Sequence, residues 1–308
     1  FVINELPDLQ ARIQVALFNI LQEGDIQIRG FKLRLPLDIQ FLFTANPEDY
    51  TNRGSIVTPL KDRIGSQILT HYPVDIETAR LITEQEARLV ESQKQKVIVP
   101  DLARDLLEQI VFEARDNEFV DAKSGVSARL SITALENLLS TAERRALISG
   151  NKITMLRLSD FVGVIPSITG KIELVYEGEQ EGAAVVAYNL IGKAVKSLFI
   201  EFFPKIGKLQ KQGDESPYDD IVSWFFNQKE GFELLDDLRD KEYKSLLDAI
   251  TPLDDLLGKY QPNLAKEDNY FVKEFVLWAL VEFKQLSKHR FAEGLQFKDP
   301  YGSFISGI

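Results

Sequence analysis

The residues of this chain best suited to chemistry follow short apolar runs. The stretch Phe1-Val2-Ile3-Asn4-Glu5 is typical of a buried strand that ends in an amide and a carboxylate. A carboxylate in that place can orient an attacking water, and an amide oxygen can hold a water bound to Mg²⁺. Glu5 is therefore the candidate base, and Asn4 with Glu5 is the candidate magnesium site, acting through water. Taken alone, the stretch also fits an ordinary strand with a solvated end.

Asn46 is the second candidate, because it follows the apolar run Phe41–Ala45 and precedes Pro47. In open α/β sheets the carboxyl ends of parallel strands face the ligand crevice. An amide there can hydrogen-bond a phosphate oxygen and the attacking water. The alternative is that Asn46-Pro47 only begins a turn.

Two arginines complete the set of candidates. Arg63, in Leu60-Lys61-Asp62-Arg63, can reach a neighbouring subunit and stabilise charge on a transferring phosphoryl group, or it can form a surface salt bridge with Asp62 or Glu48. Arg129, after Ser127-Ala128, opens a helix and can touch a phosphate or face the solvent.

Apolar spacing indicates which elements hold these residues. A period of two predicts a hairpin over Asp25–Phe41, with Pro36 marking an edge, and a core strand over Phe41–Ala45. An acidic, glycine-flanked stretch at Glu177–Gly182 predicts a linker. A first helix is expected at Asp8–Leu21, capped by Asp8 and closed by Gly24, and a bundle of four helices is expected between Asp75 and Tyr176. Further helices are expected at Ala183–Phe203, Tyr218–Asn227, Glu242–Ile250 and Asn269–Lys288. Short amphipathic helices are expected at 235–238, 247–250 and 253–256.

In this order and spacing, the stretches resemble the AAA+ ATPases, and more narrowly the magnesium-chelatase ATPase subunit and the MoxR-type group, over residues 1–176. The resemblance implies a role for each candidate. Glu5 would be the catalytic glutamate of Walker B, with Asn4 in the place of the magnesium-side acid; Asn46 would be sensor 1, Arg63 the arginine finger, Arg129 the sensor-2 arginine of the lid, and Arg53 a second interface residue.

The same resemblance implies an α/β plus α fold. We expect the C-terminal half of a P-loop NTPase core with a β-hairpin insert over residues 1–76 and a helical lid over 77–176. A mostly helical extension of unknown role is expected over 183–308.

The implied function is ATP hydrolysis with Mg²⁺, coupled to remodelling of a partner protein or to chelatase-type metal insertion. A homo-oligomeric ring, expected as a hexamer, and an unknown client would be the partners. The chain departs from the family pattern in one respect, because the P-loop motif Gly-x-x-x-x-Gly-Lys-[Ser/Thr] does not occur. Gly170-Lys171, for example, is followed by Ile172. In this family that loop lies upstream of Walker B, so we expect this chain alone to bind ATP poorly and not to hydrolyse it. A non-hydrolysing AAA-like scaffold is the alternative, since Asn4 replaces an acid.

The amino-acid composition argues against several other classes of function. Lys and Arg number 36 against 47 Asp and Glu, a formal charge of −11, which argues against binding to nucleic acid or to a membrane surface. A DNA-handling AAA+ protein is nevertheless a third interpretation, because basic residues cluster on the predicted hairpin at Arg29, Lys32 and Arg34. The absence of cysteine excludes disulfides and thiolate chemistry. No run of ~18 apolar residues occurs, so we expect no membrane span and a cytoplasmic protein.

Overall fold

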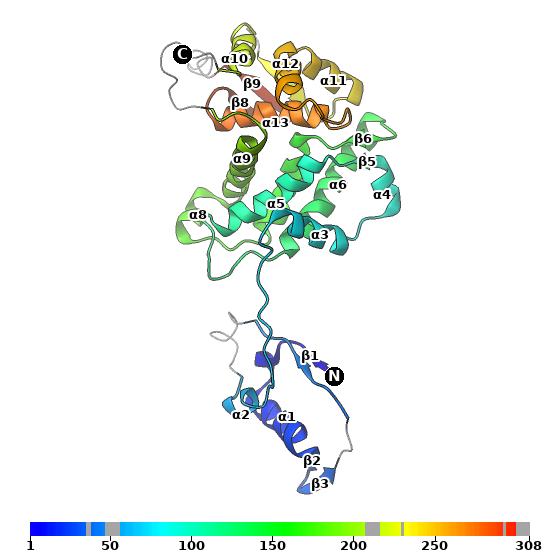
Figure 1. Cartoon of the computed structure of the whole chain (residues 1–308), viewed down its shortest axis with the longest axis vertical. Coiled ribbons are helices and arrows are strands. Elements are labelled where there is room, and N and C mark those ends of the chain that lie inside the picture. Colours follow the sequence, from blue (N-terminus) through cyan, green and yellow to red (C-terminus); the bar gives the residue numbers. More distant parts are fainter. Residues whose placement is uncertain (35–37, 47–55, 207–215, 229–230, 292–293, 300–308) are drawn as a thin grey trace. The chain divides into compact units, whose positions relative to one another are not determined.

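The computed structural model describes residues 1–34, 38–46, 56–206, 216–228, 231–291 and 294–299 (Figure 1). The chain divides into two compact units. Unit 1 is Phe1–Tyr72 and unit 2 is Pro73–Ile308.

Unit 1 is built on two short parallel strands, β1 (Val2–Ile3) and β4 (Leu42–Phe43), in which Val2 pairs with Leu42. Both predicted strands therefore form, and they run parallel as expected. The burial expected on both faces is wrong, because Val2 is 58% exposed and Leu42 is 55% exposed. Among the described residues no third strand pairs with either of them, so their outer edges are unpaired.

The helices described in unit 1 are the 3₁₀ helix η1 (Leu6–Asp8), α1 (Ala11–Glu23) and the short α2 (Thr58–Lys61). Gly24 closes α1 with φ 63°, as predicted, because only glycine adopts that backbone without cost. Asp8 does not cap α1; it ends η1, and Gln10 precedes α1. Buried Gln14 joins α1 to the segment before α2, since its Oε1 accepts from the Val57 N–H at 2.9 Å.

The hairpin predicted within 25–41 is confirmed over β2 (Asp25–Ile28) and β3 (Phe31–Arg34), which pair antiparallel. Arg29 and Gly30 form its turn, with φ of 49° and 88°. Positive φ at both central residues gives the turn a twist that matches the strands. Pro36 lies outside the described residues.

The first half of unit 2 is helical. Its helices are α3 (Ile76–Glu86), α4 (Glu91–Lys96), α5 (Asp101–Arg115), α6 (Arg129–Ser149), the 3₁₀ helix η3 (Leu158–Val164), α7 (Ile165–Thr169) and α8 (Tyr176–Glu181). A parallel pair of strands, β5 (Val97–Ile98) and β6 (Thr154–Met155), lies among them. Of the four predicted bundle helices, those that the sequence starts at Pro100 and at Ser131 are confirmed as α5 and α6. The one predicted around Leu81–Val90 is split into α3 and α4, and the one predicted from Ser159 lies within the 3₁₀ helix η3.

The second half of unit 2 contains a sheet that the sequence did not indicate. Strands β7 (Phe232–Leu235), β8 (Ser287–Phe291) and β9 (Gly294–Lys298) pair antiparallel in the order β7-β9-β8. The helices are α9 (Ala183–Phe202), α10 (Asp219–Phe226), α11 (Asp240–Asp248), α12 (Thr251–Tyr260) and α13 (Asn269–Glu282). The helix expected at 235–238 is wrong, because Leu235 ends β7, and α13 ends before the predicted Lys288, which lies in β8.

The linker predicted at Glu177–Gly182 is also wrong, because residues up to Glu181 form α8. Gly178 is packed against the Phe119 carbonyl so closely that an added Cβ would lie 2.6 Å from that oxygen. The helices before and after this point share one hydrophobic core, which extends from Val97 to Phe297. Residues 77–176 and 183–308 are thus parts of one compact unit.

Helix α9 is the central helix of this core and packs against both α5 and α13 (Figure 1). By length and composition alone it could cross a membrane, although no uninterrupted apolar run predicts a span. Half of its most apolar window is buried inside the unit. A core helix of a soluble domain has the same pattern, so this criterion is weak evidence of a span.

Candidate functional site

Asn4 and Glu5 lie at the carboxyl end of β1, beside the carboxyl end of β4. Thr44 joins the two ends: the Glu5 N–H donates to its Oγ1 at 3.0 Å, and its hydroxyl donates to Asn4 Oδ1 at 3.4 Å. The Leu6 N–H also donates to the Thr44 carbonyl at 2.9 Å. The parallel pairing therefore places an amide and a carboxylate next to the segment that leads to Asn46.

The backbone of Glu5 is in the left-handed region, with φ 52° and ψ 55°. This conformation costs a non-glycine residue about 1 kcal/mol. It is held by the hydrogen bonds on either side, from the N–H groups of Glu5 and Leu6 to Thr44. It turns the chain sharply from β1 into η1 and leaves the Glu5 side chain exposed. Sharp turns of this type recur at functional sites, where strain is maintained by surrounding contacts.

Magnesium is the ion that the resemblance implies, and the donor set can be tested against it. Mg²⁺ usually keeps several waters and binds one or two carboxylates together with substrate phosphates. The exposed oxygens of Asn4 and Glu5 fit that use. In the part of the chain that the structure describes, no group of three or more His, Cys, Asp or Glu side chains could hold a metal by itself. The site fits Mg²⁺ only when phosphate supplies further ligands.

Arg63 follows α2 and is held against α1. Its Nε donates to Gln22 Oε1 at 2.8 Å, and its Nη1 donates to the Pro59 carbonyl at 2.8 Å. The Asp62 carboxylate lies 3.7 Å from Nη1, which is the local ion pair considered from the sequence. The Arg63 side chain is 29% exposed. To act on a neighbour's phosphate it would exchange these neutral acceptors for a charged one, which is a stronger partner.

The three other candidates are Asn46, Arg53 and Arg129. Asn46 ends the described segment after β4 and is exposed, and Arg53 lies outside the described residues. Arg129 opens α6 in unit 2, where its backbone N–H donates to Ser127 Oγ at 3.2 Å. Its role as a lid arginine therefore stays a prediction.

With this geometry in hand, comparison with known proteins gives one informative similarity. The chain is 23% identical over 233 residues to the chaperone MoxR1 of Mycobacterium tuberculosis (strain ATCC 25618 / H37Rv), covering 70% of this chain and 60% of that protein. The similarity supports a MoxR-like AAA+ relationship. It does not extend to the magnesium-chelatase subgroup. No family model matches the chain, and no solved structure matches it.

The chain spans about 60% of the length of this curated relative. The mixed α/β fold is consistent with part of an AAA+ protein.

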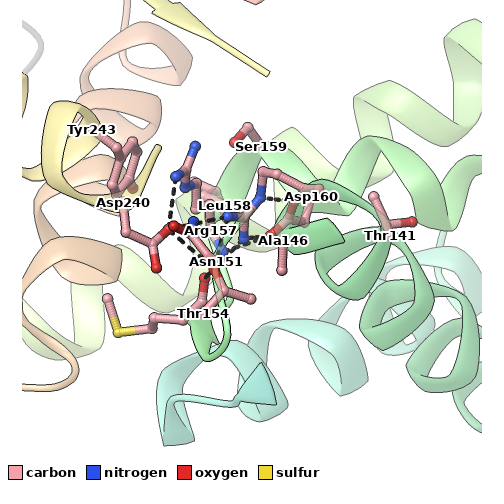
Figure 2. A network of polar contacts seen from close by, with 12 residues as sticks. Thr141, Ala146, Asn151, Thr154, Arg157, Leu158, Ser159, Asp160, Asp240 and Tyr243 are labelled. Carbon is pink, nitrogen blue, oxygen red and sulfur yellow. Dashed lines mark hydrogen bonds and ion pairs between the residues drawn. The ribbon is translucent and has the colours of Figure 1, made fainter. Parts of the chain in front are cut away.

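A second set of polar residues, which the sequence did not single out, is buried in unit 2 (Figure 2). Arg145 of α6 donates to both carboxylate oxygens of Asp160, at 2.9 and 2.8 Å, and to Thr154 Oγ1 at 2.9 Å. Arg157 donates to Asp240 at 2.9 Å, and its guanidinium lies 4.0 Å from the centre of the Tyr243 ring. We call these the arginine network.

The arginine network continues to Glu274 of α13, which is fully buried. Glu274 accepts from the backbone N–H groups of Leu158 and Ser159, both at 3.0 Å, and from the Tyr243 hydroxyl at 2.7 Å. Burial raises the pKa of Glu274, and Asp160 adds to that shift. The network thus ties η3 and α6 to α11 and α13.

Lys288 of β8 is a buried amine that the sequence also failed to indicate. Its Nζ lies 3.3 Å from the centre of the Trp278 ring and 4.9 Å from that of Tyr188, without a hydrogen-bond partner in the described structure. Burial lowers the pKa of Lys288 to about 8, against the smaller opposing effects of Glu282 and Glu274; Arg290 lowers it further.

This shift predicts a pH dependence of stability. Above the folded pKa of about 8, the unfolded state holds a proton on Lys288 that the folded state lacks, so the free energy of unfolding should rise with pH. Between roughly pH 7 and pH 9.5 we expect a gain of about 2 kcal/mol from this group. Urea titrations at the two pH values measure it. In Lys288→Met the gain should disappear, and equal gains in both proteins would contradict the prediction.

Proposed function

We propose that this chain is part of a MoxR-like AAA+ ATPase that couples ATP binding and hydrolysis to remodelling of a client protein. The relative it resembles is named a chaperone, which favours a protein client over metal insertion. The single observation that carries the proposal is the junction of β1 and β4. There the Glu5 backbone N–H and the Asn4 side chain, which follow β1, both hydrogen-bond to Thr44, which follows the parallel strand β4.

Each candidate side chain has a proposed role. Glu5 orients the attacking water and accepts its proton, and Asn46 hydrogen-bonds that water and a γ-phosphate oxygen. Asn4 holds Mg²⁺ through a water, with less attraction than an acid would supply because the amide is neutral. Arg129 contacts phosphate from the lid side, and Arg53 is a second residue at the subunit interface. Bound Mg²⁺ would neutralise charge on the phosphates.

Arg63 is proposed to act on the nucleotide of a neighbouring subunit, within a ring of identical subunits, expected as a hexamer. An arginine supplied in this way contributes on the order of 10³–10⁵ in turnover. We expect Arg63→Ala and Glu5→Gln each to inactivate the native full-length protein. Mixed in equal amounts, they should regain a measurable fraction of ATPase activity, because some sites then pair an intact Glu5 with an intact Arg63.

Lys61→Ala is the matched control for Arg63, because Lys61 lies in the same helix end and is exposed. It should keep near-normal turnover in the phosphate-release assay. If the mixture of the two inactive proteins stays inactive while each still assembles, Arg63 does not act between subunits.

A non-hydrolysing scaffold is the second candidate, favoured by Asn4 in the place of an acid and by the absence of a phosphate-loop motif in this chain. Binding of a fluorescent ATP analogue separates the two. We expect this chain alone to bind it poorly, and the native full-length protein both to bind it and to release phosphate from ATP if it is the ATPase. The cytoplasm is the proposed location.

A further inference from the structure

The hairpin β2–β3 of unit 1 has an apolar face that nothing in the described structure covers. Its register pairs Ile28 with Phe31 and Ile26 with Leu33, so these four side chains share one face. Phe31 is 80% exposed, and Ile28 and Leu33 are more than half exposed. A contiguous exposed apolar face on a two-stranded edge is a typical interaction surface.

The turn and the opposite face of the hairpin are basic. Arg29 forms the turn, and Lys32 and Arg34 lie on the face opposite Phe31. Lys32 lies 3.7 Å from Asp25, and the described residues include no ion-pair partner for Arg29 or Arg34. The hairpin therefore presents an apolar anchor together with positive charge. Its long basic side chains can extend beyond the apolar face.

Unit 2 carries a groove between α3 and α9 whose charge is opposite to that of the hairpin. It has a volume of about 510 Å³, and its apolar lining is Ile76, Leu81, Leu198 and Phe202. Leu81 is 63% exposed. The groove is thus wide enough, and apolar enough, to take an aromatic side chain.

The rim of this groove is acidic. Arg80 is fully engaged by Asp101 and Asp105, at 2.8 Å each, and Glu84 is paired with Arg104 at 2.7 Å. Two further rim carboxylates stay available, because no cation in the described parts of the chain pairs with them. They are Glu77 of α3 and Glu201 of α9.

We propose that the hairpin β2–β3 of one copy of this chain docks into the α3–α9 groove of a second copy. Phe31 enters the groove, and Arg29 and Lys32 approach Glu77 and Glu201. The contact is heterologous, since different surfaces of the two copies meet, and such contacts build rings or open chains. It needs no nucleotide, so it can fail or hold independently of the proposed ATPase function.

A nucleic acid is the alternative partner for the hairpin, because its side chains are basic. The exposed apolar face argues against it, because a phosphate backbone offers that face nothing to cover it. The acidic groove argues for a basic protein segment, and the hairpin is such a segment. The two surfaces match in both charge and apolar character.

Sedimentation equilibrium of this chain tests the proposal, with the chain mass of 35.0 kDa as the reference. We expect the average mass to rise with protein concentration in low salt, and the association to weaken in high salt. Phe31→Ser should weaken the association about tenfold or more, since it removes the buried anchor. Phe226→Ser is the matched control, because Phe226 is 69% exposed on α10 and lies on neither surface; it should associate normally.

A charge exchange makes the test specific. One variant carries Arg29→Glu with Lys32→Glu, and the other carries Glu77→Lys with Glu201→Lys. Each alone should stay at the mass of a single chain, because like charges then face each other. Their mixture should associate, since each altered surface meets its complement.

Three results would overturn the proposal. The first is a mass of 35.0 kDa at every concentration. The second is a charge-exchange mixture that does not associate. The third is association unchanged by Phe31→Ser, with a short DNA duplex bound by the parent chain and lost on Arg29→Glu with Lys32→Glu, which would assign the hairpin to nucleic acid.

Discussion

Replacing Glu5 by glutamine is expected to reduce ATP turnover by the native full-length protein about 10²- to 10⁴-fold, because the amide cannot accept a proton from the attacking water. Nucleotide binding should persist, since an exposed side chain of equal size is kept and the Glu5 N–H still donates to Thr44. Phosphate release and binding of a fluorescent ATP analogue, measured on the same protein, separate the two effects.

Glu23→Gln is the control for this experiment. Glu23 is an exposed glutamate at the end of α1 in the same unit. It should leave both turnover and binding unchanged. Normal turnover by Glu5→Gln would remove the carboxylate from the mechanism and with it the assignment of β1 as the catalytic strand.

The second large effect is expected in the arginine network. Asp160→Ala leaves the Arg145 guanidinium buried without its bidentate partner, and both side chains are at most 6% exposed in the intact protein. We expect unit 2 to lose about 3–5 kcal/mol of its free energy of unfolding. Both tryptophans, Trp224 and Trp278, belong to unit 2, so their fluorescence in a urea titration reports this unit selectively.

An exposed ion pair provides the comparison. Asp236→Ala removes the partner of Arg290, at 2.6 Å but with both side chains at least one-third exposed, and should cost less than about 1 kcal/mol. Arg145→Met combined with Asp160→Leu should recover most of the loss, because no unpaired charge then stays buried. A loss from Asp160→Ala no larger than that from Asp236→Ala would show that the network does not stabilise the unit.

Elements whose signal is local could be predicted. Helices α5, α6, α9 and α10 follow from apolar residues at helical spacing, and the hairpin β2–β3 follows from a period of two around Arg29-Gly30. The sheet β7-β9-β8 could not be predicted in this way. Strand β8 has the sequence Ser287-Lys288-His289-Arg290-Phe291, whose polar side chains do not show the apolar pattern of a strand. It forms because β9 pairs with it.

The sequence alone determined the candidate chemistry of this protein: Asn4 and Glu5 after one apolar run, Asn46 after another, and single arginines at set distances beyond them. Residue type and spacing suffice there, because strands end where their apolar runs end. Only the tertiary structure decided how residues far apart in the chain combine. Arg145, Asp160 and Glu274 carry no periodic signal, and they form one network because burial makes an unpaired charge costly. The acidic stretch expected as a linker is likewise the helix α8, whose Gly178 packs against Phe119, a contact that no local pattern indicates.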